Sequence, residues 1–131
     1  MVSADHGQVD VGDHVVYPSD DLLAAVTLQS GEGRFRWLHS VPGATAALAE
    51  AASEEFGDVA WVVTKDQTLD EHWFGPTMTP AVNARLGDVA LAAFAPVSFY
   101  DAADSGPFQL VCLHGSLTSA EVNVPLLAAL A

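Results

Sequence analysis

Basic side chains are scarce in this sequence of 131 residues: four Lys and Arg stand against 17 Asp and Glu, a formal net charge of −13 at pH 7. A surface of that sign repels nucleic-acid backbones and anionic lipid headgroups, because affinity for both comes mainly from Lys and Arg. The composition therefore argues against a nucleic-acid polymer or a membrane as a partner. Phosphate esters remain compatible with it, provided that a bound metal ion supplies the local positive charge.

Cysteine and long apolar runs are also in short supply. Cys112 is the single cysteine, so the chain can form no intrachain disulfide, and we expect a reducing, cytoplasmic environment. No window of 18 apolar residues is present, which argues against a transmembrane helix. Half of the residues are nevertheless hydrophobic, which is enough to build a core. The length predicts a single domain over residues 1–131.

Hydrophobic periodicity predicts a mixture of helices and strands. The clearest helix runs over 44–56, where Leu48, Ala52 and Phe56 form one apolar stripe. Two apolar runs on either side of a turn at 30–33 predict a β-hairpin. The hairpin strands are expected over 26–29 and 34–39, further strands over 59–64, 88–94, 97–100 and 108–113, and short helices over 20–25, 66–72 and 80–86.

Two of these segments carry finer predictions. The strand over 59–64 lacks alternation, which predicts that both of its faces are covered. Residues 118–121 have the S/T-x-x-E form of a capping box and are expected to open the last helix. The fold class is predicted as α/β with mixed α+β character.

Polar motifs follow two of the apolar segments. Asp5-His6-Gly7 follows the strand-like residues 2–4, and His114-Gly115 follows the run over 108–113. Open α/β sheets place ligands in loops after strand ends, and a carboxylate with imidazoles suits zinc or a similar ion. The alternative is a pair of ordinary polar loops, with His114 hydrogen bonded near Thr118. A second Asp-His pair, at 13–14, is interpreted as a solvated loop.

The two motifs resemble known metal-binding segments. Residues 2–7, VSADHG, look like the S/T-(A)-D-H-G segment of type I phosphodiesterases and nucleotide pyrophosphatases, within the alkaline phosphatase superfamily. Residues 113–118, LHGSLT, resemble that family's closing HGS-x-T segment. Residues 73–76, 86–89 and 121–127 are similar to its actinobacterial, and so bacterial, members, and the resemblance covers essentially the whole chain.

The resemblance implies a hydrolase with two divalent metal ions, usually zinc, side by side. It implies that Asp5 and His6 bind one ion and that His114 binds the other. In the family a Thr or Ser nucleophile attacks phosphorus of a phosphate ester or nucleotide and forms a covalent intermediate. The implied fold is the C-terminal portion of an alkaline-phosphatase-like sheet, with residues 13–107 as an inserted small α+β region.

One departure from the family pattern limits what this chain can do. The family's nucleophile, its first metal-binding Asp and its Asp-x-x-x-His pair precede the D-H-G segment, and only five residues precede His6 here. We therefore expect the chain to be part of a longer protein, to contain no catalytic nucleophile and to be inactive alone. Ser116 and Thr118 match the closing segment and do not replace the nucleophile.

Two interpretations stay open for the region between the motifs and for the chain as a whole. Trp73 and Phe74, with Trp37, either line a substrate pocket by stacking on a base or are core side chains, and burial is the commoner role of large aromatics. The alternative to a hydrolase is a non-catalytic α/β module that binds a partner or forms an oligomer. Its interface is expected to be the apolar face against which the absent N-terminal part would pack.

Overall fold

The computed structural model describes residues 1–104 and 110–129. Short strands predominate in its element order. The strands are β1 (Val2–Ser3), β2 (Val9–Asp10), β3 (Val15–Val16), β4 (Val26–Glu32), β5 (Phe35–Ser40), β6 (Ala60–Thr64), β7 (Val89–Ala93), β8 (Ser98–Phe99), β9 (Cys112–Leu113) and β10 (Leu126–Leu127). The helices are α1 (Asp20–Leu23), α2 (Thr45–Phe56), α3 (Lys65–Asp70), α4 (Pro80–Asn83) and α5 (Ser119–Val122). The mixture of helices and strands confirms the mixed class.

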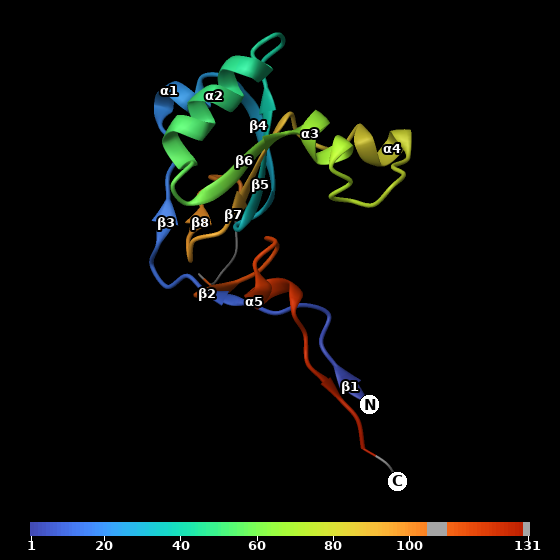
Figure 1. Cartoon of the computed structure of the whole chain (residues 1–131). Coiled ribbons are helices and arrows are strands. Elements are labelled where there is room, and N and C mark those ends of the chain that lie inside the picture. The colour runs from blue at the N-terminus through green and yellow to red at the C-terminus, as the bar shows by residue number, and fades with distance from the viewer. Residues whose placement is uncertain (105–109, 130–131) are drawn as a thin grey trace.

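A four-stranded sheet in the order β4-β5-β7-β6 forms the centre of the molecule, and every neighbouring pair in it is antiparallel. Its first two strands confirm the predicted hairpin. The strand β4 is longer than predicted because Ser30 and Gly31 pair with Trp37 and Arg36 instead of forming the turn. Figure 1 shows α1 and α2 against one face of this sheet.

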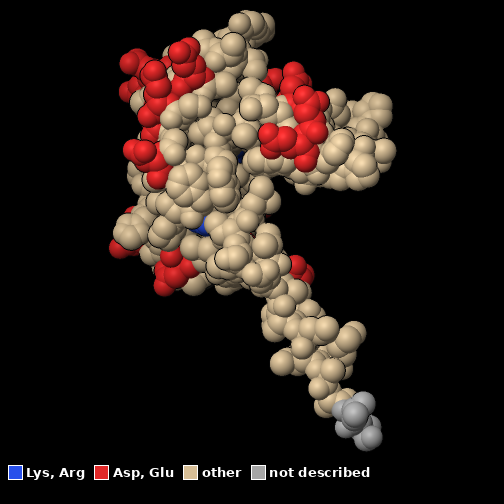
Figure 2. Space-filling model, viewed as in Figure 1, with Lys and Arg blue, Asp and Glu red and all other residues tan. Residues whose placement is uncertain are grey.

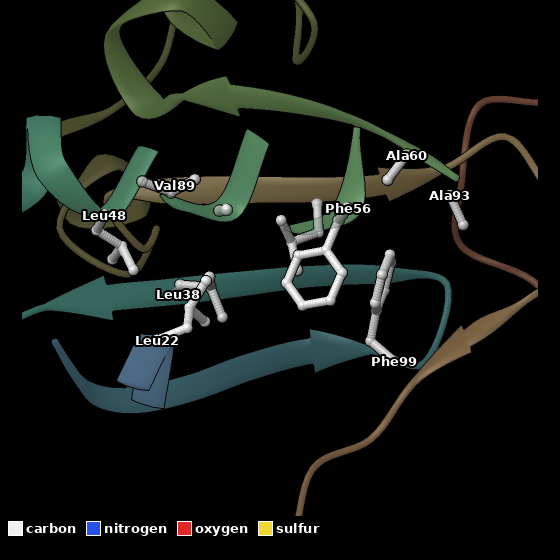
Figure 3. Close-up of a cluster of buried hydrophobic side chains, with 10 residues drawn as sticks. Leu22, Leu38, Leu48, Phe56, Ala60, Val89, Ala93 and Phe99 are labelled. Atoms are coloured by element: carbon white, nitrogen blue, oxygen red, sulfur yellow. The ribbon is translucent and has the colours of Figure 1, made fainter. Parts of the chain in front are cut away.

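The core lies between α2 and the sheet. The helix α2 begins at Thr45 and ends at Phe56, and its stripe of Leu48, Ala52 and Phe56 is fully buried, as the periodicity predicts. These side chains pack on Leu38 from β5 and on residues of β7, as Figure 3 shows. Fully burying a Leu or Phe side chain contributes about 1.5–3 kcal/mol, so this layer is the main source of stability.

The prediction that both faces of the strand over 59–64 are covered is wrong. In the structure β6 is an edge strand that pairs with β7 alone, and its Trp61 is 43% exposed. Trp61 packs edge-on against Phe94, with ring centroids 5.4 Å apart. The apolar run of β6 lacks alternation because one face of the strand packs on the core, while on the other face Trp61 is covered only in part, by Phe94.

Two helix predictions also need correction. The helix expected over 80–86 ends at Asn83, so α4 has only one turn, opened by Thr79 and Pro80. The capping box expected at 118–121 is absent: α5 begins after Thr118 without a side-chain cap, and the Thr118 hydroxyl donates to Glu121 instead. A capping box does form at the start of α3, between Thr64 and Gln67.

The two ends of the described chain pair with each other. The strand β1 is antiparallel to β10, and β2 is antiparallel to β9. In Figure 1 the β1–β10 ladder projects from the body as an arm, with the N-terminus at its tip. The strands β3 and β8 pair in parallel where the chain enters and leaves the central sheet.

Residues 108 and 109 of the predicted strand over 108–113 lie outside the described residues, and the remainder forms strand only at Cys112 and Leu113. Cys112 is half-buried, so it is less enclosed than a core residue. Across the described ranges, no helix combines the length and apolar character needed to cross a bilayer.

Candidate functional site

The structure brings the two predicted metal-binding motifs together, although not by the route that the sequence suggests. We expect them after neighbouring strands of one open sheet, whereas β1 and β9 belong to separate two-stranded ladders outside the central sheet. They meet because the pairing of β2 with β9 places residues 9–10 beside residues 112–113. A hydrogen bond of 2.7 Å from Gly7 N to the carbonyl oxygen of Glu121 then fixes the first motif against α5.

Gly7 is required by this close approach. A Cβ atom at position 7 would lie 1.9 Å from the carbonyl oxygen of Ala120, which is far inside van der Waals contact. Any side chain here would push the Asp5-His6 segment away from α5. The glycine of the D-H-G motif therefore serves chain packing in this structure.

His6 and His114 stack face to face. Their ring centroids are 3.7 Å apart, with an interplanar angle of 18°. His6 Nδ1 lies 2.8 Å from the carbonyl oxygen of Gly7, and because a carbonyl only accepts, Nδ1 carries the proton. The other ring nitrogen, Nε2, lies 3.8 Å from Oδ2 of Asp5, and in the neutral ring it is the one that can bind a metal ion.

This arrangement fits part of a metal site. Metal-binding imidazoles commonly donate their second ring N–H to a backbone carbonyl, as His6 does. Two ligand atoms about 2.0–2.1 Å from a tetrahedral ion lie roughly 3.3 Å apart, so the 3.8 Å between His6 Nε2 and Asp5 Oδ2 would have to shorten on binding. Within the described ranges, however, no group of three or more His, Cys, Asp or Glu side chains is arranged to hold an ion. Asp5 and His6 form one pair of donors, and His114 is stacked on His6 without completing a group of three.

Glu121 joins the two motifs to the rest of the molecule, and sequence reasoning missed it. Its side chain is only 3% exposed and forms an ion pair with the fully buried Arg34, with Arg34 Nε 2.8 Å from Oε1. Oε1 also accepts from the backbone N–H of Ser116 at 3.0 Å, and Oε2 accepts from the Thr118 hydroxyl. A buried carboxylate needs such partners because desolvation without them is costly.

The contacts of Glu121 set its protonation state. Burial raises the pKa of the carboxyl, but hydrogen bonds from Arg34, Thr118 and Ser116, together with the charge of Arg34, outweigh it. The pKa of Glu121 is therefore lowered from its ordinary value, and the side chain is an anion at neutral pH.

The signal that could have revealed Arg34 is strand alternation. Arg36 lies in β5 on the same side as the buried Leu38, and Arg34, in the turn just before β5, continues this alternation. Arg36 is buried as well: its guanidinium donates to Asp101 at 3.1 Å, to Asp104 and to the carbonyl oxygen of Phe99. Buried arginines in an acidic chain imply carboxylate partners, although the sequence does not say which.

The predicted aromatic residues form a cluster on the other side of β5. Trp37 is buried, which agrees with the core interpretation for this residue, whereas Trp73 is half-buried and Phe74 is exposed. Phe35 joins them, with ring centroids 6.4 Å from Trp73 and 6.3 Å from Phe74. A cavity of about 340 Å³ beside α3 and α4 is lined by neighbouring residues such as Leu69 but by neither Trp73 nor Phe74.

The remaining Asp-His pair lies in a turn, with both side chains exposed, as predicted. Neither residue of this pair takes part in the stack of His6 and His114.

Comparison with known proteins assigns no family: no protein-family model matches the chain, and no curated protein matches it significantly. What the chain does must therefore be inferred from its residues and their geometry.

Proposed function

We propose that this chain is the C-terminal part of a metal-dependent phosphodiesterase or nucleotide pyrophosphatase, with an alkaline-phosphatase-like fold. The observation that carries the proposal is the stack of His6 on His114. These residues are 108 positions apart (114 − 6 = 108), they come from the two motifs that resemble metal-binding segments, and they meet in the fold. Asp5 adds a carboxylate beside His6 Nε2.

The chain topology supports an inserted region between the motifs. Residues 2–10 pair with residues 112–127 through two antiparallel ladders, and the central sheet with its helices lies between them in the sequence. Residues 13–107 are then a small α+β unit, and the two ladders form a stem that carries it. In the proposal the stem holds the metal ligands, and Trp73 and Phe74 of the inserted unit lie on the substrate side.

The proposed role of this chain's residues is to bind and orient metal. Asp5 and His6 hold one divalent ion, most simply zinc, and His114 holds a second ion beside it. Bound there, such ions would supply Lewis-acid stabilisation of the negative charge on the phosphate oxygens. The nucleophile and the remaining ligands belong to a preceding part of the protein, so this chain alone is expected not to turn over phosphate esters or nucleotides.

Zn²⁺ titration followed by NMR of the imidazole signals tests the site directly. We expect the signals of His6 and His114 to shift at lower Zn²⁺ concentration than those of the other three histidines. Asp5→Ala should weaken this response, and Asp13→Ala, which alters the exposed Asp-His pair, is the matched control. Equal responses from all the histidines would count against a metal site here.

The coding frame tests the larger claim. We expect the frame upstream of residue 1 to encode an early Asp, a Thr or Ser nucleophile and an Asp-x-x-x-His pair. Multiple turnover of a phosphodiester by the pure chain, abolished by Asp5→Ala, would contradict the assignment of the nucleophile to a preceding segment.

A second candidate function, a binding or oligomerisation module, is favoured by the exposed arm. Val2, Leu126 and Leu127 are 67%, 68% and 64% exposed, and an isolated two-stranded ladder is marginally stable in water. Paired apolar residues of this kind mark contact surfaces. Light scattering should then detect an oligomer that Leu126→Ser disrupts and Leu28→Ser, an exposed change in β4, leaves intact. A monomer at high concentration would remove this candidate.

A further inference from the structure

Glu121 lies where the two histidine motifs meet. Its carbonyl oxygen accepts from Gly7 N at 2.7 Å, directly after His6, and its carboxylate oxygen Oε1 accepts from Ser116 N at 3.0 Å, two residues after His114. One residue of α5 therefore fixes the backbone on both sides of the stack. No polar contact between the rings themselves is needed to hold them together, because each ring is carried by a backbone that Glu121 restrains.

The carboxylate is in turn fixed by the central sheet. Arg34 holds it with two hydrogen bonds, from Nε at 2.8 Å and from Nη2 at 3.0 Å. The same guanidinium donates to three carbonyl oxygens at the end of β7 and in the loop that follows it, those of Ala93, Ala95 and Val97. Five hydrogen bonds on one buried side chain leave Arg34 no freedom to move, so the position of Glu121 is set by the sheet.

We propose that Glu121 is a positioning residue that sets the contact between His6 and His114, and that Arg34 transmits this position from the central sheet. The claim about the ring contact stands by itself, whereas its consequence for metal binding rests on the proposed function. A purely structural ion pair would affect stability alone. A positioning residue also changes the geometry of the two rings in a protein that stays folded.

The test uses the full chain and a pair of variants. Glu121→Gln keeps the size of the side chain but leaves the buried Arg34 without an anion, which can prevent folding. The double variant Arg34→Met with Glu121→Met removes both charges together with the acceptor for Ser116 N, and it is the variant expected to stay folded. Glu55→Gln is the matched control, because Glu55 also accepts from a backbone N–H and a hydroxyl, both of Ser19, away from the stack.

Ring contact is measured by NMR at pH 7, through the nuclear Overhauser effect between the imidazoles of His6 and His114 and their ring-current shifts. Methyl signals of Leu38 and Leu48 report the core. We expect the double variant to lose the Overhauser effect and at least about half of the ring-current shift, with unchanged core signals, and Glu55→Gln to retain both. Unchanged rings in a folded variant would overturn the proposal. Loss of the core signals in both Glu121→Gln and the double variant would also overturn it, because Glu121 would then be needed for folding and not specifically for the ring contact.

A Zn²⁺ titration of the same proteins separates this inference from the proposed function. Loss of an outer support typically lowers metal affinity 10–100-fold, so the double variant should need at least about tenfold more Zn²⁺ to shift His6 and His114. If Zn²⁺ leaves the wild-type rings unaffected, the proposed function fails while the ring-contact result still stands. If the double variant binds Zn²⁺ as the wild type does, the positioning role fails.

Discussion

Glu121 is buried and still carries its charge, because several hydrogen-bond donors surround its carboxylate. Arg34, Ser116 and Thr118 all donate to one carboxylate. A pair of this kind gives little net stability relative to well-packed apolar side chains, but removing one partner strands a buried charge and costs about 3–5 kcal/mol. The single variant Glu121→Gln should therefore be far less stable than the double variant Arg34→Met with Glu121→Met.

The lowered pKa of Glu121 makes the contribution of this pair depend on pH. A carboxyl whose folded pKa is lowered stabilises the fold fully above its unfolded pKa of about 4.3, and that stabilisation is lost as the pH falls through the folded value. Between pH 7 and 5, we expect the stability difference between the wild type and the double variant to be constant. Below about pH 4.3 the difference should shift against the wild type.

Urea denaturation at a series of pH values measures this difference, and Glu55→Gln serves as the control for acid effects elsewhere. Comparing variants is necessary because all acidic groups titrate in the same range. A difference that stays flat from pH 5 to pH 3 would mean that the Glu121 carboxyl is not held ionised by Arg34.

Short sequence motifs predicted the two histidine segments better than they predicted the Arg34–Glu121 pair that holds these segments in place. The segments around His6 and His114 carry recognisable short patterns, and the fold does bring the two rings together. Glu121 was predicted only as a capping residue, because the S/T-x-x-E pattern is local and contains no information about Arg34, 87 positions away in the chain. An ion pair between residues so far apart in the sequence cannot be predicted from the pattern of either segment alone.

Among the elements, α3 has the most complete local capping. The Thr64 side chain accepts from Gln67 N, and the Gln67 side chain accepts from Thr64 N. Thr64→Ala removes one half of this capping box and should lower the free energy of unfolding by about 0.5–2 kcal/mol. Thr27→Ala, which changes an exposed threonine in β4, is the matched control, and urea denaturation of both variants measures the effect.

If Thr64→Ala and Thr27→Ala were equally stable, the cap would contribute nothing beyond the tertiary contacts of α3. A larger loss than expected would point to β6, which ends at Thr64 and would be shortened with the cap.

Element prediction succeeded where a segment carries its own pattern. The helix α2 and the strands β5, β6 and β7 are long enough for apolar periodicity to mark them. The strands β1, β2, β9 and β10 have two residues each, and they exist because residues near one end of the chain pair with residues near the other. Such pairing is decided by the whole fold, so local pattern marks residues 2–4 and 108–113 as strand-like but predicts neither their partners nor the arm.

At the scale of the molecule, charge is distributed very unevenly. Arg34 and Arg36 are buried in ion pairs with Glu121 and Asp101, so the surface keeps the full net negative charge, and Lys65 and Arg85 are the remaining basic side chains. Figure 2 shows Asp and Glu gathered over α1 and α2 and again near α3, while the arm is almost free of charge. Like charges of this density oppose the compact state.

Salt should therefore stabilise the protein. Raising ionic strength from 0.01 to 0.15 M shortens the screening length from about 30 Å to about 8 Å, which weakens repulsion between the acidic patches. We expect the thermal midpoint measured by calorimetry to rise with NaCl. The increase should be smaller in a Glu50→Gln, Glu54→Gln variant of α2, and a midpoint that falls with salt would mean that surface attraction outweighs repulsion.

The arm has one more consequence. Its two strands run in opposite directions with Val2 opposite Leu127, and paired residues in such a ladder lie about 4.5–5.5 Å apart. The chain between these two strands therefore starts and ends at neighbouring positions, as an inserted domain does in a host loop (Figure 1). Loop closure costs about 0.6 kcal/mol for each doubling of length, so a host chain would carry the whole unit for about 3 kcal/mol more than a four-residue loop. The paired strands therefore span only the width of a surface turn, which is the spacing that insertion into another chain requires.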